Sequence, residues 1–241
     1  YIVGNGSNLL VADEGVRGVV IQLLRNFNQI QVEGCQIRMQ AGAQNAAVAK
    51  RALDASLTGF EFAAGIPGTI GGAVVMNAGA YGGEMKDILK EVTVLDQNGM
   101  IRTIPAEELE LGYRTSIIAR KGYVVLEAVI VLKTGDPKEI KAAIDDLKEK
   151  RVTKQPLEYP SAGSTFKRPE GYFAGKLIMD AGLRGFSVGG AQISEKHCGF
   201  VINKGNATAK DVTELMDETK KIVMEKFGVA LEPEVKRLGQ F

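Results

Sequence analysis

The stretch of sequence that decides the fold reads GIPGTIGGAVVMNAGAYGG, from Gly65 to Gly83. It belongs to a general excess of glycine, since 29 of the 241 residues are glycine, or about 12% against a usual ~7%. A turn without Cβ atoms lets backbone N–H groups face an anion such as a phosphate. The run has neither the Gly-Lys-Ser/Thr of a P-loop nor the Gly-x-Gly-x-x-Gly of a dinucleotide fingerprint. Spacing alone therefore favours an anion-binding turn and a tightly packed buried turn about equally.

The overall composition argues against several classes of function. The net charge of +1 gives no electrostatic reason to expect nucleic acid or a membrane as a partner. The longest apolar run, Tyr123–Leu132, contains Glu127 and is far shorter than the ~20 residues that span a bilayer. A single histidine, His197, argues against a metal site. Two cysteines, Cys35 and Cys198, do not make a disulfide framework and favour a cytoplasmic location, and we expect no obligate protein partner.

Hydrophobic periodicity and turn residues predict a β-rich first part of the chain. Runs rich in β-branched residues flank Glu33-Gly34 and again Asn98-Gly99, and each pair of runs predicts a hairpin. An alanine-rich stretch favours a helix. The predicted elements are strands at 1–3, 9–11, 19–21, 29–32, 36–39, 92–95, 100–104 and 123–132, and a helix at 43–53.

The pattern becomes more helical after residue 133. Pro137 opens a predicted helix that runs to Arg151. Thr208 and Asp211 form a capping box before a second helical stripe, and Gly228 is placed to end it. The last hundred or so residues therefore mix helices and strands. We predict two domains, at 1–133 and 138–241.

Two further segments carry residues that suit a phosphorylated ligand. The turn Gly4–Leu9 follows a strand and offers backbone N–H groups and a serine hydroxyl, although an ordinary β-turn explains it on its own. The segment Ser161–Pro169 places hydroxyls beside Lys167 and Arg168, although a solvated basic loop is the simpler interpretation. A serine nucleophile needs a base and a Gly-x-Ser-x-Gly elbow is absent, so a hydrolase is not expected.

Taken together and in order, these motifs resemble the UDP-N-acetylenolpyruvoylglucosamine reductases. The resemblance spans essentially the whole chain. It rests on GNGSNLLV (4–11), the run at 65–83, GYRTS (112–116), GSTFKRP (163–169), AGKLIMDAGLRG (174–185), SEKHCGF (194–200) and LEPEVKRLG (231–239).

The resemblance implies an α+β fold. Its first domain is similar to the flavin-binding fold of vanillyl-alcohol oxidase and its relatives, and an α+β domain that binds the UDP-sugar follows. The chain resembles the shorter, second type of the family, because no insertion follows the Tyr-Arg-x-Ser motif at 113–116. The family has another βαβ unit before the strand at Tyr1–Val3, so we expect the N-terminal part of the flavin-binding fold to be missing from this chain.

The resemblance also implies a reaction and its residues. FAD would be reduced by NADPH and would reduce the enolpyruvyl ether of the UDP-sugar to UDP-N-acetylmuramate, a peptidoglycan precursor of the bacterial cell wall. Arg114, Ser164 and Glu234 match the catalytic arginine, serine and glutamate. Tyr113, Lys167 and Arg168 would bind the substrate. The implied FAD-binding residues are Gly4, Asn5, Gly6, Ser7, Asn8, Leu9, Gly65, Pro67, Gly68, Thr69, Gly71, Gly72, Asn77, Ala78 and Gly79.

Two alternatives stay open on the sequence. The first alternative is a different flavin oxidoreductase of the same fold, acting on an alcohol or a sugar. The second is that the chain, in this shortened form, is a non-redox fragment that binds a UDP-sugar. The segments at 164–168 and 232–234 argue against the first alternative, since that broader group need not have them.

Overall fold

The computed structural model describes all 241 residues, and their tertiary contacts form two compact units. Unit 1 contains Tyr1–Gly6 and Val19–Arg151, and unit 2 contains Ser7–Gly18 and Val152–Phe241. A short segment near the start of the chain therefore packs with the C-terminal part. The predicted division of the chain into two ligand-binding domains, at 1–133 and 138–241, stays a prediction.

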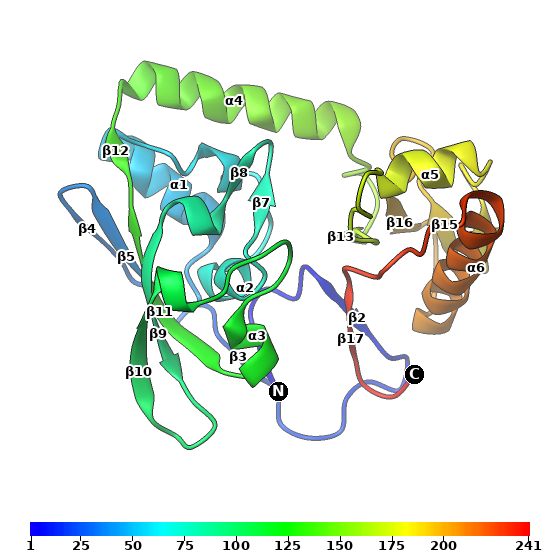
Figure 1. Cartoon of the computed structure of the whole chain (residues 1–241), viewed down its shortest axis with the longest axis horizontal. Helices are drawn as coiled ribbons and strands as arrows, with labels where there is room; N and C mark the ends of the chain where they lie inside the picture. Colours follow the sequence, from blue (N-terminus) through cyan, green and yellow to red (C-terminus); the bar gives the residue numbers. More distant parts are fainter. The chain divides into compact units, whose positions relative to one another are not determined.

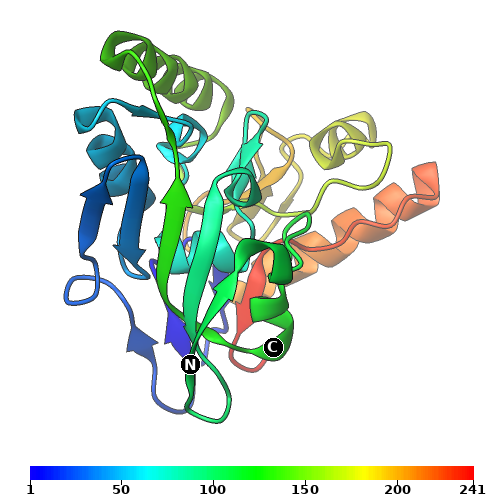
Figure 2. The ribbon, with the colours of Figure 1, turned by 60° about the vertical axis from the view of Figure 1, so that its left-hand side comes forward.

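Unit 1 is built on a five-stranded sheet with the order β10-β9-β11-β5-β4, in which all neighbours are antiparallel (Figure 2). Side chains alternate between buried and more exposed along β5, as expected when one face of a sheet is covered. Both predicted hairpins are confirmed. The strands are β4 (Ile30–Glu33), β5 (Gln36–Gln40), β9 (Leu89–Leu95), β10 (Ile101–Pro105) and β11 (Val124–Val131).

Helices cover one face of this sheet, where its buried aliphatic side chains form the core of unit 1. The predicted alanine-rich helix is confirmed as α1. The helix that opens at Pro137 continues three residues beyond Arg151, to Lys154, because only the residue before Pro156 is pushed away from helical geometry. The helices of this part are α1 (Asn45–Asp54), α2 (Ile70–Val75), α3 (Ile117–Lys121) and α4 (Pro137–Lys154), with 3-10 turns at Glu61–Ala63, Met85–Asp87 and Ala106–Glu108.

Three pairs of two-residue strands complete unit 1. The strand predicted at 19–21 forms only at Ile21–Gln22, where it pairs in parallel with the start of the chain. The pairs are β1 (Ile2–Val3) with β3 (Ile21–Gln22), β6 (Leu57–Thr58) with β12 (Lys133–Thr134), and β7 (Gly79–Ala80) with β8 (Gly83–Glu84).

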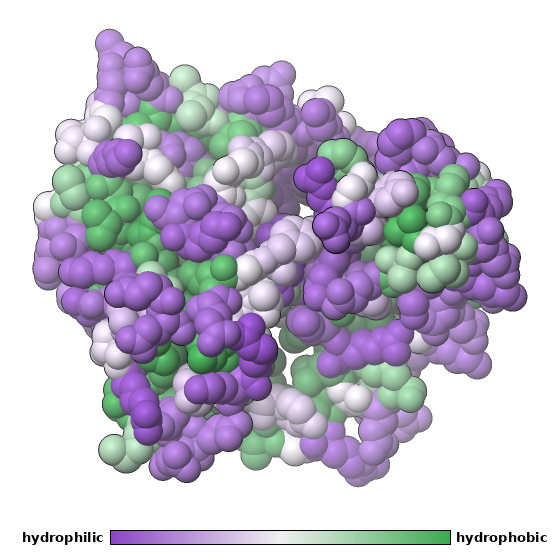
Figure 3. Space-filling model, in the orientation of Figure 1, coloured by the Kyte–Doolittle hydropathy of each residue, from purple (hydrophilic) through white to green (hydrophobic).

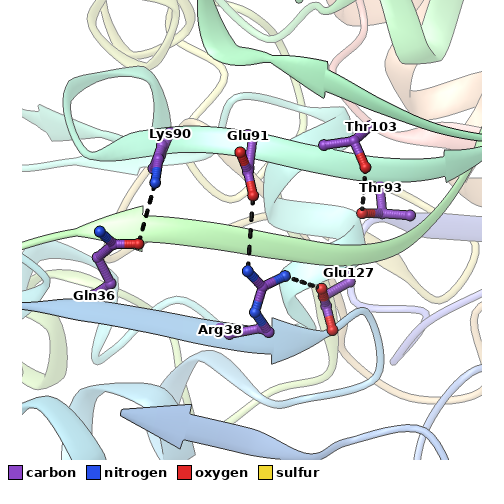
Figure 4. Close-up of polar contacts among 7 residues, drawn as sticks. All are labelled: Gln36, Arg38, Lys90, Glu91, Thr93, Thr103 and Glu127. Carbon is purple, nitrogen blue, oxygen red and sulfur yellow. Dashed lines mark hydrogen bonds and ion pairs between the residues drawn. The ribbon is translucent and has the colours of Figure 1, made fainter. Parts of the chain in front are cut away.

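The other face of the five-stranded sheet is polar (Figure 4). Arg38 on β5 forms ion pairs with Glu91 on β9 and Glu127 on β11. The hydrogen bond from Arg38 to Glu127 raises the pKa of the guanidinium above its ordinary value. These side chains are 29–40% exposed, so the pairs contribute little to stability. They keep this face of the sheet hydrophilic and carry no sign of a ligand site.

The turn of the β9–β10 hairpin is longer than its Asn-Gly signal predicts. It spans residues 96–100, and the carboxylate of Asp96 accepts hydrogen bonds from the backbone N–H groups of Asn98 and Met100 at 2.8 and 2.9 Å. These bonds, with the nearby Arg102, hold the pKa of Asp96 below its ordinary value. The turn is therefore organised by an aspartate side chain, while Gly99 supplies the positive φ of +78°.

Unit 2 contains a four-stranded antiparallel sheet with the order β13-β16-β15-β14, and two helices that pack on it (Figure 1). A separate parallel pair joins β2 to β17, which brings the segment before Gly18 against the end of the chain. The elements are β2 (Leu9–Val11), β13 (Ser161–Ser164), α5 (Ala174–Asp180), β14 (Ser187–Val188), β15 (Ala191–Ile193), β16 (Phe200–Asn203), α6 (Ala209–Phe227) and β17 (Lys236–Leu238).

Both ends of α6 follow the sequence prediction. The Thr208 side chain accepts from the N–H of Asp211, and the Asp211 carboxylate accepts from the N–H of Thr208, so the capping box is confirmed. Gly228 ends the helix with φ +66°. The carboxylate of Asp13, from the segment before Gly18, adds a second cap because it accepts from the N–H groups of Ala209 and Lys210.

The surface is largely hydrophilic on the face shown in Figure 3, with smaller hydrophobic patches between the polar residues. No helix is both long enough and apolar enough to serve as a membrane span.

Candidate functional site

The glycine run forms a loop, helix α2 and the β7–β8 hairpin, all within unit 1. Gly68 has φ +134°, a conformation that side chains rarely allow. Gly71 lies against Ala41: its N–H donates to the Ala41 carbonyl at 2.8 Å, and a Cβ added at Gly71 would be 3.0 Å from the Ala41 Cβ. Gly72, by contrast, is exposed. Part of the run is therefore required for close packing, while the rest leaves backbone open to the surface.

Gly4 brings the two glycine segments together in unit 1. A Cβ added at Gly4 would lie 2.4 Å from the hydroxyl oxygen of Thr69, which is only 2% exposed. The Nε2 of Gln22 donates to the Gly4 carbonyl at 3.1 Å and holds the backbone there. The turn after β1 thus runs directly beside the loop that precedes α2.

The segment Gly4–Leu9, predicted as one FAD-binding turn, is divided between the two units. Gly4, Asn5 and Gly6 belong to unit 1, and Ser7, Asn8 and Leu9 belong to unit 2. In unit 2 the side chain of Asn8 donates to the carbonyl of Glu234 at 3.3 Å, and the N–H of Lys236 donates to the Asn8 carbonyl at 2.9 Å. Asn8 therefore supports the backbone of a predicted catalytic residue.

Asn77 is a completely buried junction inside the glycine run. Its Nδ2 donates to the carboxylate of Glu84 at 2.8 Å and to the carbonyl of Gly112 at 3.0 Å. Its Oδ1 accepts from the N–H of Lys86 at 2.9 Å. Asn77 also has φ +41°, which asparagine tolerates better than most residues. The side chain of Asn77 therefore holds the surrounding loops in place, and its FAD contact stays a prediction.

The GYRTS motif packs against the same run. Arg114 donates from Nη2 to the carbonyl of Gly79 at 3.0 Å, and its guanidinium lies 5.0 Å from the centre of the Tyr113 ring. The hydroxyl of Ser116 donates to the Val75 carbonyl at 2.7 Å. Arg114 has φ +55°, a strained conformation of the kind that occurs at functional sites. Unit 1 therefore places the predicted catalytic arginine beside the end of the glycine run.

Unit 2 places the segments of Ser164 and Glu234 side by side. The N–H of Glu234 donates to the carbonyl of Thr165, and the N–H of Lys167 donates to the carbonyl of Glu232, both at 2.8 Å. Thr165 is buried, and its hydroxyl accepts from the N–H of Val201 at 2.9 Å. This antiparallel pairing brings together two motifs that lie far apart in the sequence.

The predicted substrate-binding cations also lie in unit 2. Lys167 forms an ion pair with Glu232, the first acid of the Glu-Pro-Glu motif. Arg168 donates to the Tyr172 carbonyl at 3.3 Å and lies 3.9 Å from the centre of the Phe173 ring. Ser164 and Arg168 are exposed, so this part of the surface is accessible within its unit.

His197 has a structural position. Its Nδ1 accepts from the N–H of Gly199 at 3.0 Å, and its ring meets the Phe200 ring edge to face. A Cβ at Gly175 or at Gly199 would lie 3.2 or 2.9 Å from the ring. Burial lowers the pKa of His197 below its ordinary value, so the neutral form is favoured.

Two residues beside the glycine run were missed by the sequence reasoning. Asn45 is 1% exposed; its N–H donates to the Gly68 carbonyl, and its Nδ2 donates to the Ile66 carbonyl, both at 3.2 Å. Its Oδ1 is buried without a hydrogen-bond partner. The polar pair Gln44-Asn45 at the start of an alanine-rich helix was the available signal. The second residue is Arg151, which lies on α4. The sequence did not indicate it, because a charged residue in an exposed helix is ordinary.

These features fit the flavin nucleotide that the resemblance implies. The loop at 65–69 offers backbone without Cβ atoms at Gly65 and Gly68, and Asn45 supplies a buried oxygen that can accept a hydrogen bond. Unit 1 therefore offers a loop free of side chains at two positions and a buried acceptor, both of which fit a nucleotide.

Comparison with known proteins supports both parts of the chain. Residues 1–105 match the model of an FAD binding domain, and residues 155–238 match the C-terminal domain of UDP-N-acetylenolpyruvoylglucosamine reductase. These matches confirm the predicted fold class, a flavin-binding domain followed by a C-terminal domain, both built from helices and strands.

Individual proteins give the same result. The UDP-N-acetylenolpyruvoylglucosamine reductase of Agathobacter rectalis is 58% identical, over all of this chain and 80% of that protein. The reductase of the same name from Clostridium perfringens is 59% identical, over all of this chain and 79% of that protein. The crystal structure of the reductase from Thermus caldophilus has a TM-score of 0.87 at 39% identity, and the match covers 99% of this chain and 85% of that one.

Proposed function

The chain belongs to the UDP-N-acetylenolpyruvoylglucosamine reductase family, and we propose that Arg114, Ser164 and Glu234 carry its reaction. It is an FAD-dependent oxidoreductase that reduces UDP-N-acetylenolpyruvoylglucosamine in peptidoglycan precursor synthesis. NADPH is the hydride donor, and the product is UDP-N-acetylmuramate. We infer a cytoplasmic location, because Cys35 and Cys198 are both free thiols and a reducing compartment keeps them so.

The observation that carries the proposal is the backbone pairing of two segments in unit 2. The hydrogen bond from Glu234 to Thr165 places the segment that contains Ser164 next to the segment that contains the carboxylate. An acid-base pair in an enzyme must be held at hydrogen-bonding range of the reacting atoms, and backbone pairing gives such a constraint. The buried Thr165 anchors this arrangement to β16 through Val201.

The proposed roles follow from the charge that the reaction develops. Bound FAD, once reduced by NADPH, would supply the hydride for the β-carbon of the enolpyruvyl group. Negative charge then develops on the α-carbon and the substrate carboxylate, and the guanidinium of Arg114 stabilises it. The hydroxyl of Ser164 donates a proton to the α-carbon. Since serine is a weak acid in water, it needs a partner, and Glu234 orients and polarises the hydroxyl in this proposal.

The binding roles divide between the units in the same way. We assign the FAD contacts to the backbone of the glycine run and to the turn at Gly4–Leu9, and substrate contacts to Tyr113, Lys167 and Arg168. Lys and Arg side chains suit the diphosphate of a UDP-sugar, because both carry a full charge and Arg can donate two parallel hydrogen bonds.

The test follows NADPH oxidation by purified protein with and without the enolpyruvyl UDP-sugar. We expect a yellow protein, and NADPH consumption that depends on the sugar. Ser164→Ala and Glu234→Gln should lower kcat by about 10²–10⁴-fold while NADPH still reduces the flavin. Matched controls are Ser161→Ala, an exposed serine on the same strand, and Glu218→Gln, an exposed acid on α6. Both controls should keep near wild-type rates.

Two results would contradict the proposal. A colourless protein that cannot be reconstituted with FAD would contradict the oxidoreductase function. Full turnover of the UDP-sugar in both the Ser164 and the Glu234 variants would leave the function standing but would withdraw the assigned roles.

A further inference from the structure

Arg151 is a half-buried cation with no acidic partner. It lies in the last turn of α4, and no carboxylate is within ion-pair distance of its guanidinium. Its neighbour Lys150 is different, because it is exposed and pairs with Asp146 at 2.6 Å. Burial lowers the pKa of Arg151, which means that its charge is poorly solvated where it lies. A charge withdrawn from water without a partner is costly, so its position calls for an explanation.

The guanidinium lies over the first residue of the glycine run. A Cβ added at Gly65 would be 3.3 Å from the Cδ of Arg151 and 3.5 Å from its Nη1. Gly65 itself is exposed. The arginine therefore packs directly on the glycine, and a side chain at position 65 would require it to shift.

The far end of the glycine run approaches the same arginine. Tyr81 stands at the tip of the β7–β8 hairpin, and its phenol is close enough to interact electrostatically with Lys150 and Arg151. Figure 1 shows α4 running above this hairpin. Tyr81 has φ +53°, a strained conformation for a residue with a side chain. Arg151 is thus flanked by the beginning and the end of the run.

We propose that Arg151 is a phosphate-binding residue, whose guanidinium pairs with a phosphate of a nucleotide that binds against the glycine run. Its planar fork of N–H groups matches phosphate oxygens in pairs, and a bound phosphate would supply the missing negative charge. The inference rests on the proposed function, because FAD, NADPH and the UDP-sugar all carry phosphates. The substrate carboxylate is already assigned to Arg114, so the phosphates are the anionic groups of these ligands that are left for Arg151.

The experiment measures dissociation constants of the full-length chain for FAD, UDP and NADP⁺ at low and high salt. FAD is added to flavin-free protein and followed by quenching of its fluorescence, and the other two are titrated by calorimetry. We expect R151Q to weaken one nucleotide by at least about tenfold and R151K to lie between it and wild type. The salt dependence of that affinity should also fall. K150Q, the adjacent paired cation, should stay within about twofold of wild type.

The identity of the weakened nucleotide tells which phosphate Arg151 binds. A loss confined to FAD, to UDP or to NADP⁺ supports the proposal and selects the ligand. Unchanged affinity of R151Q for all three, with wild type binding them, overturns the role of Arg151 and leaves the proposed function intact. An equal loss of all three, together with a lower Tm than K150Q, indicates a folding defect and also overturns it. A wild-type chain that binds neither FAD nor UDP contradicts the proposed function and the role of Arg151 with it.

Discussion

The backbone N–H of Glu234 donates a hydrogen bond to the carbonyl oxygen of Thr165 across 2.8 Å. The bond uses main-chain atoms alone, so it does not depend on the side chains at either position. Substitution of the Glu234 carboxylate should therefore leave the pairing of the two segments in place. This is why loss of turnover in a Glu234 variant can be attributed to the missing carboxylate.

A side chain at position 4 should disrupt the contact between the two glycine segments. Gly4→Ala places a methyl group 2.4 Å from the buried hydroxyl of Thr69, and overpacking of this kind costs about 1–3 kcal/mol. We expect a lower Tm in thermal unfolding followed by circular dichroism. Adding Thr69→Ala should restore most of the loss, since it removes the colliding atom. If the double variant is no more stable than Gly4→Ala alone, the clash is not the cause.

The buried side chain of Asn77 should be essential to the loops around the glycine run. Asn77→Ala removes the hydrogen bonds of the side chain to Glu84, Gly112 and Lys86, and each of these bonds contributes about 0.5–1.5 kcal/mol. Asn77→Gly separates the causes, because glycine accepts φ +41° but also lacks the side chain. Similar losses in urea unfolding for both variants would assign the effect to the hydrogen bonds, whereas a stable glycine variant would assign it to the backbone.

The second cap on α6 should be measurable. Asp13→Ala removes the carboxylate that accepts from Ala209 and Lys210, at a cost of about 0.5–2 kcal/mol in the free energy of unfolding. Glu14→Ala is the matched control, because Glu14 is an exposed acid one residue away. Equal stability of the two variants in urea titration would show that Asp13 contributes nothing to the helix.

His197 should make the stability depend on pH in one direction. Burial lowers its pKa in the folded state, so protonation favours the unfolded chain, whose histidine has a pKa of about 6.5. The contribution is fully present above that value and is lost as the pH falls through the lower pKa of the folded state. His197→Gln should flatten this part of the curve of unfolding free energy against pH. A curve unchanged by the substitution would assign the pH dependence to other groups.

Much of the fold could be predicted because it depends on local chemistry. The hairpins follow from residues alternating between two faces with turn residues between them, and α6 follows from its capping box and from Gly228. The predicted bounds of the strand at 19–21 and of the end of α4 were less accurate. In both places a continuous pattern gave no boundary, and pairing with β1 or the approach of Pro156 decided it.

The candidate site could be predicted only as a set of segments. The sequence named the motifs of Arg114, Ser164 and Glu234, but it did not indicate that Asn8 supports Glu234 or that Arg114 binds the carbonyl of Gly79. Asn45 was missed because an amide near a helix start is usually a surface residue.

The sequence by itself determined the family, the order of the elements and the residue types available for catalysis. These depend on the identity and spacing of neighbouring residues, which a motif records directly. Only the tertiary structure decided that the first glycine turn is shared between two units, that Asn77 serves as a buried junction, and that Arg151 covers Gly65. Such contacts join residues that are distant along the chain, and they form only when packing of the core and backbone pairing fix where each segment lies.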